Sequence, residues 1–207
     1  MFQLHVVDRS NRHAYAGYLE DYFKVRHDIY VGERGWLDLA RADGREIDDF
    51  DSGDAIYLLG ICPQRKFVAG SRLLPSLKPH LLNDVFPQLA EGRVPRGEDV
   101  FEWTRFFVVP ALRSQGRPSN AAGVVYCGIV EFCLKREIRQ LSVVCEPHWL
   151  QRFESLSWNP VQLGSPLICK DGPIIGILLN ISEEALSTTR TFYGITQSVI
   201  SNYLVSN

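Results

Sequence analysis

The sequence VFEWTRFFVVPALRSQGRPSNAAGVVYCGIVEFC, residues 100–133, decides the class of the fold. Its first ten residues, Val100–Val109, are mostly β-branched or aromatic and predict a strand. Pro110–Pro118 is rich in turn residues and predicts a loop. Apolar and small residues from about 119 to 137 predict a helix, with Ser119 or Asn120 as its N-cap. A buried strand, Gln140–Cys145, follows, so this part of the chain alternates strand, helix and strand.

Further strands and helices are predicted on both sides of this stretch. Apolar residues spaced i, i+3, i+4, i+7 predict an amphipathic helix over about residues 11–30. Residues 31–54 are polar and without a period, and a segment of this length is often functional. The whole pattern predicts one α/β domain over residues 1–207, a three-layer α-β-α sandwich with a mixed central sheet. The other predicted elements are strands at residues 1–8, Ala55–Cys62, Lys66–Leu74, Val161–Cys169 and Pro173–Ile181, short helices at His80–Leu89 and Pro147–Leu156, and a last helix opened by Ser182.

The composition is that of a soluble globular protein. Of the 207 residues, 45% are hydrophobic and 22% are charged, and the formal net charge is −2. This composition excludes a disordered chain, and without a run of 18 apolar residues no membrane partner is expected. A net negative charge disfavours nucleic acid as a partner. The start lacks the features of a signal peptide, and five cysteines without C-x-x-C spacing predict reduced core residues in a cytoplasmic protein that has no metal site.

The predicted loop Pro110–Pro118, between the strand Val100–Val109 and the helix that follows, offers an anion site. It reads Arg113-Ser-Gln-Gly-Arg117, and the helix that follows aims free N–H groups and a positive dipole end at a ligand. Gly116 allows a close backbone approach, so a pyrophosphate such as that of coenzyme A would fit. The loop resembles that of the GCN5-related acyltransferases, R/Q-x-x-G-x-G/A, except that Pro118 stands in place of the last glycine or alanine. The alternative is that this acid-free, arginine-bearing segment arose by chance.

The strand itself carries charge on both of its expected faces. Alternation places Glu102, Thr104 and Phe106 on one face, and Trp103 and Arg105 on the other. A core strand with charged residues on both faces is costly unless those residues are paired or bind something. The strand is therefore a candidate for the active site.

Charge also appears in two other apolar segments. Arg72 lies on the preceding predicted strand, and Arg26 lies in the apolar stripe of the first helix. Between Arg41 and Asp54 the chain carries six acids, which could bind cationic groups. The alternatives are structural ion pairs that bind no ligand, and a solvated acidic loop. Buried ion pairs are hard to justify by stability alone, which favours a functional role.

Seven sequence motifs in the same order resemble those of the acyl-homoserine lactone synthases, the LuxI-type autoinducer synthases of bacterial quorum sensing. They span residues 26–110, and the coarse layout continues to about residue 190. Two positions depart from the family pattern, because Tyr30 replaces the usual phenylalanine and Trp103 a smaller aliphatic residue. The motifs are Arg26 followed four residues later by Tyr30, Glu33-Arg34-Gly35-Trp36, Gly44-Arg45-Glu46-Ile47-Asp48-Asp49-Phe50-Asp51, Tyr57-Leu58, Gly70-Ser71-Arg72-Leu73-Leu74-Pro75, Asp84-Val85-Phe86 and Glu102-Trp103-Thr104-Arg105-Phe106.

The resemblance implies an enzyme that uses S-adenosylmethionine and an acyl thioester as small-molecule substrates, with no cofactor. The methionyl amine attacks the thioester to give an amide, and the carboxylate then closes the lactone and releases methylthioadenosine. The amine must lose a proton, for which Glu102 is the candidate base, directly or through a water. Arg105 could instead hold Glu102 ionised.

The resemblance also implies roles for the other residues, and the charges of the substrates suit them. Carboxylates suit the ammonium and sulfonium, arginines suit the carboxylate, and aromatic rings suit the adenine or the sulfonium. The predicted residues are Glu102 and Arg105 for catalysis; Arg26, Tyr30, Trp36, Asp48, Asp51, Arg72 and Phe86 for S-adenosylmethionine; and Trp103, Thr104, Phe106, Arg113, Gly116, Arg117, Ser142 and Trp149 for the acyl group or coenzyme A.

Coenzyme A carrying a short branched or aryl acyl group is the predicted donor. An acidic carrier protein would dock on a basic surface, and Pro147–Trp158 offers only Arg152 as a cation, beside Glu154. Aromatic residues around Trp103 would also crowd an acyl tunnel. An acyl carrier protein bound to Lys135, Arg136 and Arg139 is the alternative donor. The alternative functions are acylation of another amine by a GCN5-related acyltransferase and a non-catalytic ligand sensor.

Overall fold

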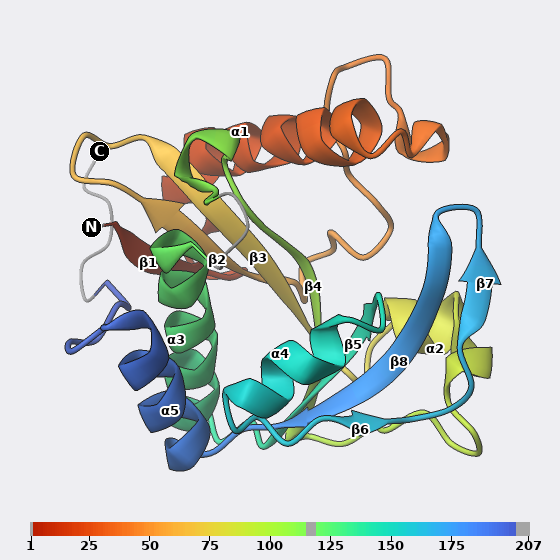
Figure 1. The fold of residues 1–207 in the computed structure, drawn as a ribbon. Helices are drawn as coiled ribbons and strands as arrows, with labels where there is room; N and C mark the ends of the chain where they lie inside the picture. Colours follow the sequence, from red (N-terminus) through yellow and green to blue (C-terminus); the bar gives the residue numbers. More distant parts are fainter. Residues whose placement is uncertain (1, 115–118, 202–207) are drawn as a thin grey trace. The chain divides into compact units, whose positions relative to one another are not determined.

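The computed structural model describes residues 2–114 and 119–201. In this part of the chain eight strands form a mixed sheet, in the order β1-β2-β3-β4-β5-β8-β6, with β7 paired to β8 (Figure 1). Strands β4 and β5 are parallel, whereas β1 with β2 and β5 with β8 are antiparallel. The predicted α/β class with a mixed sheet is confirmed. The strands are β1 (Gln3–Val7), β2 (Ile56–Ile61), β3 (Phe67–Pro75), β4 (Val100–Val108), β5 (Gln140–Cys145), β6 (Val161–Gln162), β7 (Leu167–Cys169) and β8 (Gly172–Asn180).

The helices follow the predicted order. The helix expected over residues 11–30 is three consecutive segments: a 3₁₀ turn at Arg12–Tyr15, helix α1 at Ala16–Arg26 and a π-helical segment at His27–Glu33. A segment predicted as one strand, Val161–Cys169, is instead the two short strands β6 and β7. The α-helices are α1 (Ala16–Arg26), α2 (Leu81–Asp84), α3 (Asn120–Lys135), α4 (Trp149–Ser155) and α5 (Glu183–Tyr193).

Two helix N-caps agree with the sequence. Ser119 accepts a hydrogen bond from the N–H of Ala122, so it is the residue that caps α3. Ser182 accepts from the N–H of Ala185 and caps α5. Each cap satisfies one of the N–H groups that a helix start leaves without an intrahelical partner.

The described chain divides into two compact units. The first holds residues up to Arg72, those from Arg105 to Val125 and those from Val199 onward, and the second holds Leu73–Thr104 and Tyr126–Ser198. The boundaries fall within β3, β4 and α3. The prediction of a single domain over residues 1–207 stays a prediction.

An aromatic cluster forms the core of the first unit around α1. Tyr22 is fully buried, stacks on Phe107 at 5.5 Å and meets Tyr57 and Phe67 edge-on. The close approach of the Tyr22 ring to β3 requires glycine at position 70, because a Cβ there would lie closer to this ring than real Cβ atoms come.

The second unit has its own core. All six residues of β5 pair with β8, and Ile175, Ile177 and Leu179 of β8 are fully buried. The five cysteines of the chain form no disulfide in the described residues. None of the helices in this described part is long and apolar enough to cross a membrane.

Candidate active site

Six charged side chains meet in the first unit and form a network in which three arginines face three carboxylates. Arg26 pairs with Glu46 and, at 2.8 Å, with Asp51. Arg72 and Arg105 both pair with Asp48, whose Oδ2 accepts a hydrogen bond of 2.9 Å from the Nη2 of each arginine. The remaining contacts are Arg72 with Asp51 at 2.8 Å and Arg105 with Glu46 at 2.9 Å. The six formal charges of this charge network cancel.

Burial separates the six residues into two groups. The side chains of Arg26 and Arg72 have no exposed surface, and those of Glu46 and Asp51 are 1% exposed. Asp48 and Arg105 keep 15% and 10% of their side-chain surface exposed. These two form the accessible edge of the charge network, so they are the members that a bound ligand meets first.

The arginines keep the buried carboxylates ionised. Burial alone would raise the pKa of Asp51, but Arg72 and Arg26 outweigh it and hold this pKa well below its usual value. Burial alone would also raise the pKa of Glu46, but hydrogen bonds from Arg26 and Arg105 outweigh it and hold this pKa below its usual value. These two buried carboxylates are therefore ionised at neutral pH.

One donor of the charge network is left without a hydrogen bond. Arg26 Nη2 is buried and has no hydrogen-bond partner, and Asp48 Oδ2 lies 3.7 Å from it. A buried polar group in this state is costly and is usually satisfied by a water or a ligand. It is the type of donor that a ligand carboxylate would use.

Two of the predicted aromatic residues stack beside the charge network. Tyr30 lies on the π-helical segment, a feature often found at functional sites, and its ring stacks on Trp36 at 5.2 Å and 17°. The guanidinium carbon of Arg105 lies 5.2 Å from the centroid of the Tyr30 ring, and that of Arg34 lies 5.3 Å from that of Trp36. Each ring of this stack therefore has an arginine beside it.

Strand β4 contains one residue, Arg105, with an unusual backbone conformation. This residue has φ 53°, a left-handed conformation that is rare for a residue other than glycine and is common at strained functional sites. The predicted alternation that places Glu102, Thr104 and Phe106 on one face assumed a regular strand, and it stays a prediction.

Glu102 has a specific set of partners in the second unit. Its side chain is fully buried, and its two oxygens accept hydrogen bonds from the backbone N–H groups of Leu81 at 2.8 Å and Leu82 at 2.6 Å. The carboxylate therefore anchors the start of α2. Its role as a base stays a prediction. Arg105 donates hydrogen bonds to Glu46 and Asp48.

Trp103 stands in an aromatic cluster of the second unit. Its ring lies within 6 Å of the ring centroids of Tyr126, Phe153 and Trp158, and Trp158 donates from Nε1 to Thr189 at 2.9 Å. Trp149 belongs to the same cluster, because it stacks on Phe153 at 5.8 Å. Trp103 and Trp149 therefore lie in a crowded apolar environment.

The other predicted residues lie apart from these clusters or outside the described chain. Ser142 and Thr104 are buried on β5 and β4, and the Ser142 hydroxyl donates to the carbonyl of Phe101. Phe86 is half-buried in the second unit. Arg113 pairs with Glu33 at 2.6 Å in the first unit. Gly116 and Arg117 lie outside the described residues.

Glu46 and Tyr57 are the residues that the sequence prediction missed. Glu46 joins Arg26 to Arg105, and the Tyr57 hydroxyl donates to Asp51 at 2.9 Å. Both stand inside the motifs quoted above, so the available signal was their place in the pattern, not their chemistry.

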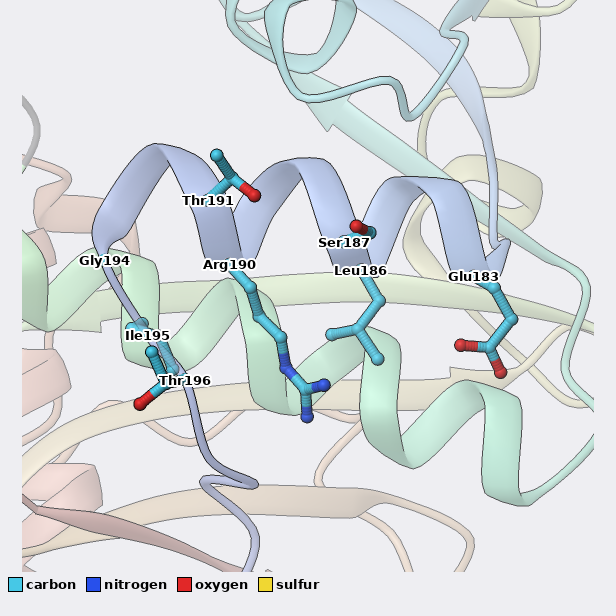
Figure 2. A pocket seen from close by; sticks show the side chains of 8 residues that line it. All are labelled: Glu183, Leu186, Ser187, Arg190, Thr191, Gly194, Ile195 and Thr196. Atoms are coloured by element: carbon cyan, nitrogen blue, oxygen red, sulfur yellow. The ribbon is translucent and has the colours of Figure 1, made fainter.

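A separate pocket of about 370 Å³ lies along α5 in the second unit. Figure 2 shows Arg190 extending from α5, and its Nη2 bonds Glu131 at 2.8 Å. No residue predicted for the site lines this pocket. It is lined by Glu183, Leu186, Ser187, Arg190, Thr191, Gly194, Ile195 and Thr196.

Comparison with known proteins identifies the class and then the family. The chain superposes on an aminoglycoside acetyltransferase with a TM-score of 0.54 over 92% of this chain and 99% of that one, at 11% identity, which shows an acetyltransferase type of fold. The model of the autoinducer synthase family matches residues 10–189. The chain therefore belongs to the autoinducer synthase family, whose members are acyl-homoserine-lactone synthases.

Individual relatives agree with this assignment. The chain is 37% identical over 185 residues to the isovaleryl-homoserine lactone synthase of Bradyrhizobium diazoefficiens, covering 88% of this chain and 82% of that protein. It matches the CoA-dependent acyl-homoserine lactone synthase MesI with a TM-score of 0.88 and 44% identity, over 97% of this chain and all of that one. It also matches BjaI, a CoA-dependent synthase solved with SAM and isopentyl-CoA, with a TM-score of 0.90 and 33% identity over 97% and 93% of the two chains.

Proposed function

We propose that this acyl-homoserine-lactone synthase joins S-adenosylmethionine to a short branched or aryl acyl group carried on coenzyme A. We place its action in the cytoplasm, where both substrates are made. The observation that carries the proposal is the internally neutral charge network of the first unit, with its accessible edge of Asp48 and Arg105 beside the Tyr30–Trp36 stack.

The charge network matches the charges of S-adenosylmethionine. This substrate has an ammonium, a sulfonium and a carboxylate close together. Asp48 would meet a cationic group, and Arg105 or the unpartnered Nη2 of Arg26 would meet the carboxylate. The stacked rings of Tyr30 and Trp36 would face the adenine or the sulfonium. The buried members hold these groups in place and need not touch the substrate.

The chemistry then needs two displacements. The amine, once it has lost its proton, attacks the thioester carbonyl, the C–S bond breaks, and the thiol leaves with a proton while the amide forms. The carboxylate oxygen next attacks the carbon γ to it, the bond from that carbon to the sulfonium breaks, and methylthioadenosine leaves as a neutral thioether. Holding the carboxylate and this carbon in a folded conformer supplies most of what ring closure requires. Glu102 is the proposed acceptor of the proton from the amine, directly or through a water.

Two observations support a compact acyl group on coenzyme A. Two of the proposed acyl residues, Trp103 and Trp149, lie among large aromatic rings. Two structurally similar relatives, BjaI and MesI, are CoA-dependent synthases, and BjaI was solved with isopentyl-CoA. A third point comes from the sequence, which gives Pro147–Trp158 only one arginine or lysine, Arg152, for an acidic carrier protein.

The test is a side-by-side assay of isovaleryl, aryl and octanoyl groups, each on coenzyme A and on acyl carrier protein. We expect the highest kcat/KM for a short branched or aryl thioester of coenzyme A. A carrier-protein thioester that exceeds every coenzyme A thioester would contradict the proposed donor. Release of methylthioadenosine is followed in the same reactions, because acylation of another amine would not produce it.

A further inference from the structure

The carboxylate of Asp51 is the centre of the charge network. Its Oδ1 accepts from Arg26 Nη1 at 2.8 Å and from the Tyr57 hydroxyl at 2.9 Å, and Arg72 Nη1 also lies 2.8 Å from it. Its Oδ2 accepts from the backbone N–H of Asp48 at 2.9 Å. The position of this one carboxylate therefore determines where two buried guanidiniums and the backbone of Asp48 stand.

Tyr57 is held from the other side by Arg12. Arg12 Nη2 donates to the Tyr57 oxygen at 3.3 Å and to the carbonyl of Ser52 at 2.9 Å, and its guanidinium carbon lies 5.2 Å from the centroid of the Tyr57 ring. Since the phenol oxygen accepts from Arg12, its single proton is directed to Asp51. Tyr57 is fully buried, so bulk water does not compete for either bond.

The hydroxyl of Tyr57 remains a donor at every pH at which the enzyme would work. Burial, followed by the negative charge of Asp51, raises the pKa of Tyr57 above its usual value. The rings of Tyr22, at 5.4 Å, and Phe23, at 6.2 Å, pack edge-on against that of Tyr57 and fix its orientation. The bond to Asp51 is thus preorganised by packing as well as by charge.

We propose that Tyr57 is a positioning residue for the binding of S-adenosylmethionine. Arg12 orients Tyr57, Tyr57 holds the carboxylate of Asp51, and Asp51 holds the backbone N–H of Asp48, whose side chain is at the accessible edge. Tyr57 acts only through these residues and does not touch the substrate. The inference rests on the proposed function, because it assumes that the charge network receives S-adenosylmethionine.

The first experiment replaces one oxygen atom. Tyr57→Phe keeps the ring and its packing and removes the bond to Asp51. We expect the Kd for S-adenosylmethionine, measured by calorimetry, to rise about ten-fold, as for one lost charge-assisted hydrogen bond. We expect kcat and the KM for the acyl donor to change by less than about two-fold, because the reacting groups are retained. Tyr18→Phe is the matched control, since Tyr18 bonds the Arg65 carbonyl at 3.3 Å outside the charge network.

The effect on the Kd for S-adenosylmethionine, compared with the effects on kcat and on the KM for the acyl donor, decides whether Tyr57 is a positioning residue. A purely structural tyrosine would lower the melting temperature and the fraction of active enzyme, and would leave the Kd of the folded fraction unchanged. That result, or equal losses in all constants, would overturn the proposal. Wild-type protein that fails to bind S-adenosylmethionine would refute the proposed function instead, so the two failures are distinguishable.

A second variant covers the case in which Tyr57→Phe does not fold. Arg12→Met keeps an apolar stem over the ring and removes the donor, and we expect a rise of about three-fold in the same Kd. If both variants fold, the double variant should match Tyr57→Phe alone, because Arg12 acts through Tyr57. Additive effects on the Kd, or no effect of Arg12→Met, would overturn this part of the proposal.

Discussion

Asp51→Asn tests whether the buried half of the charge network supports the fold. Asp51 is 1% exposed and faces two fully buried arginines, Arg26 and Arg72. The substitution leaves three arginines opposite two carboxylates and turns one acceptor into an amide. Breaking a buried ion pair in this way costs about 3–5 kcal/mol, so we expect the free energy of unfolding to fall by that amount.

Asp48→Asn is the matched control at the accessible edge. Its side chain is 15% exposed, so water partly replaces what is lost, and we expect a loss of about 1–2 kcal/mol in stability. It should instead weaken binding of S-adenosylmethionine strongly, by about 2–5 kcal/mol if the contact is desolvated. The two substitutions thus compare how much a buried and an accessible member of one charge network stabilise the fold.

Urea denaturation, followed by the fluorescence of the four tryptophans, measures the stabilities. The slope m should stay constant, so that a shifted midpoint reports stability. Asp51→Asn within about 1 kcal/mol of the wild type, or less destabilised than Asp48→Asn, would refute the division into buried and accessible members.

The pH dependence of stability gives an independent check on Asp51. Arg72 and Arg26 hold the pKa of Asp51 below its ordinary value of 3.8, despite burial. A depressed pKa in the folded state adds stability above pH about 3.8, and this stability is lost as the pH falls toward the folded-state pKa. The wild type should therefore lose stability below pH 4, and Asp51→Asn should show a flatter acid limb. Equal acid limbs for the two proteins would contradict the assignment.

Three further substitutions test the rest of the structure. Gly70→Ala should lower the free energy of unfolding by about 1–3 kcal/mol, because it pushes a Cβ into the ring of Tyr22. The control Gly17→Ala on α1, where a Cβ meets nothing within 4 Å, should be neutral or stabilising. Equal melting temperatures for the two variants would contradict this prediction. Glu102→Gln should lower kcat far more than it raises either KM. It should also lower stability, because the NH₂ of the new glutamine faces a backbone N–H donor. A near-normal kcat at all pH values would exclude Glu102 as the base. Trp103→Leu should raise the kcat/KM of octanoyl relative to isovaleryl thioesters, and an unchanged ratio would remove Trp103 from the acyl site.

Local patterns in the sequence were sufficient for most of the elements. The strand Gln140–Cys145 was predicted with its observed bounds, and Ser182 caps the helix that it was predicted to open. The segment Val161–Cys169 was predicted wrongly, because its apolar residues suit one strand, whereas the chain pairs with β8 in two short stretches. Periodicity reports which faces are apolar, but it does not report where pairing stops.

The sequence by itself determined which charged residues were out of place, and only the tertiary structure decided what they do there. Arg26, Arg72 and Arg105 were recognisable because they interrupt apolar segments. Their partners, in contrast, lie 20 to 59 positions away along the chain, as Arg26 with Glu46 and Arg105 with Glu46 illustrate. The left-handed backbone of Arg105 gives no local signal either, since the surrounding residues favour a regular strand. Hydrogen bonds and ion pairs act over a few ångströms in space, whereas sequence patterns report only neighbours along the chain, so the charge network had to be found in the fold.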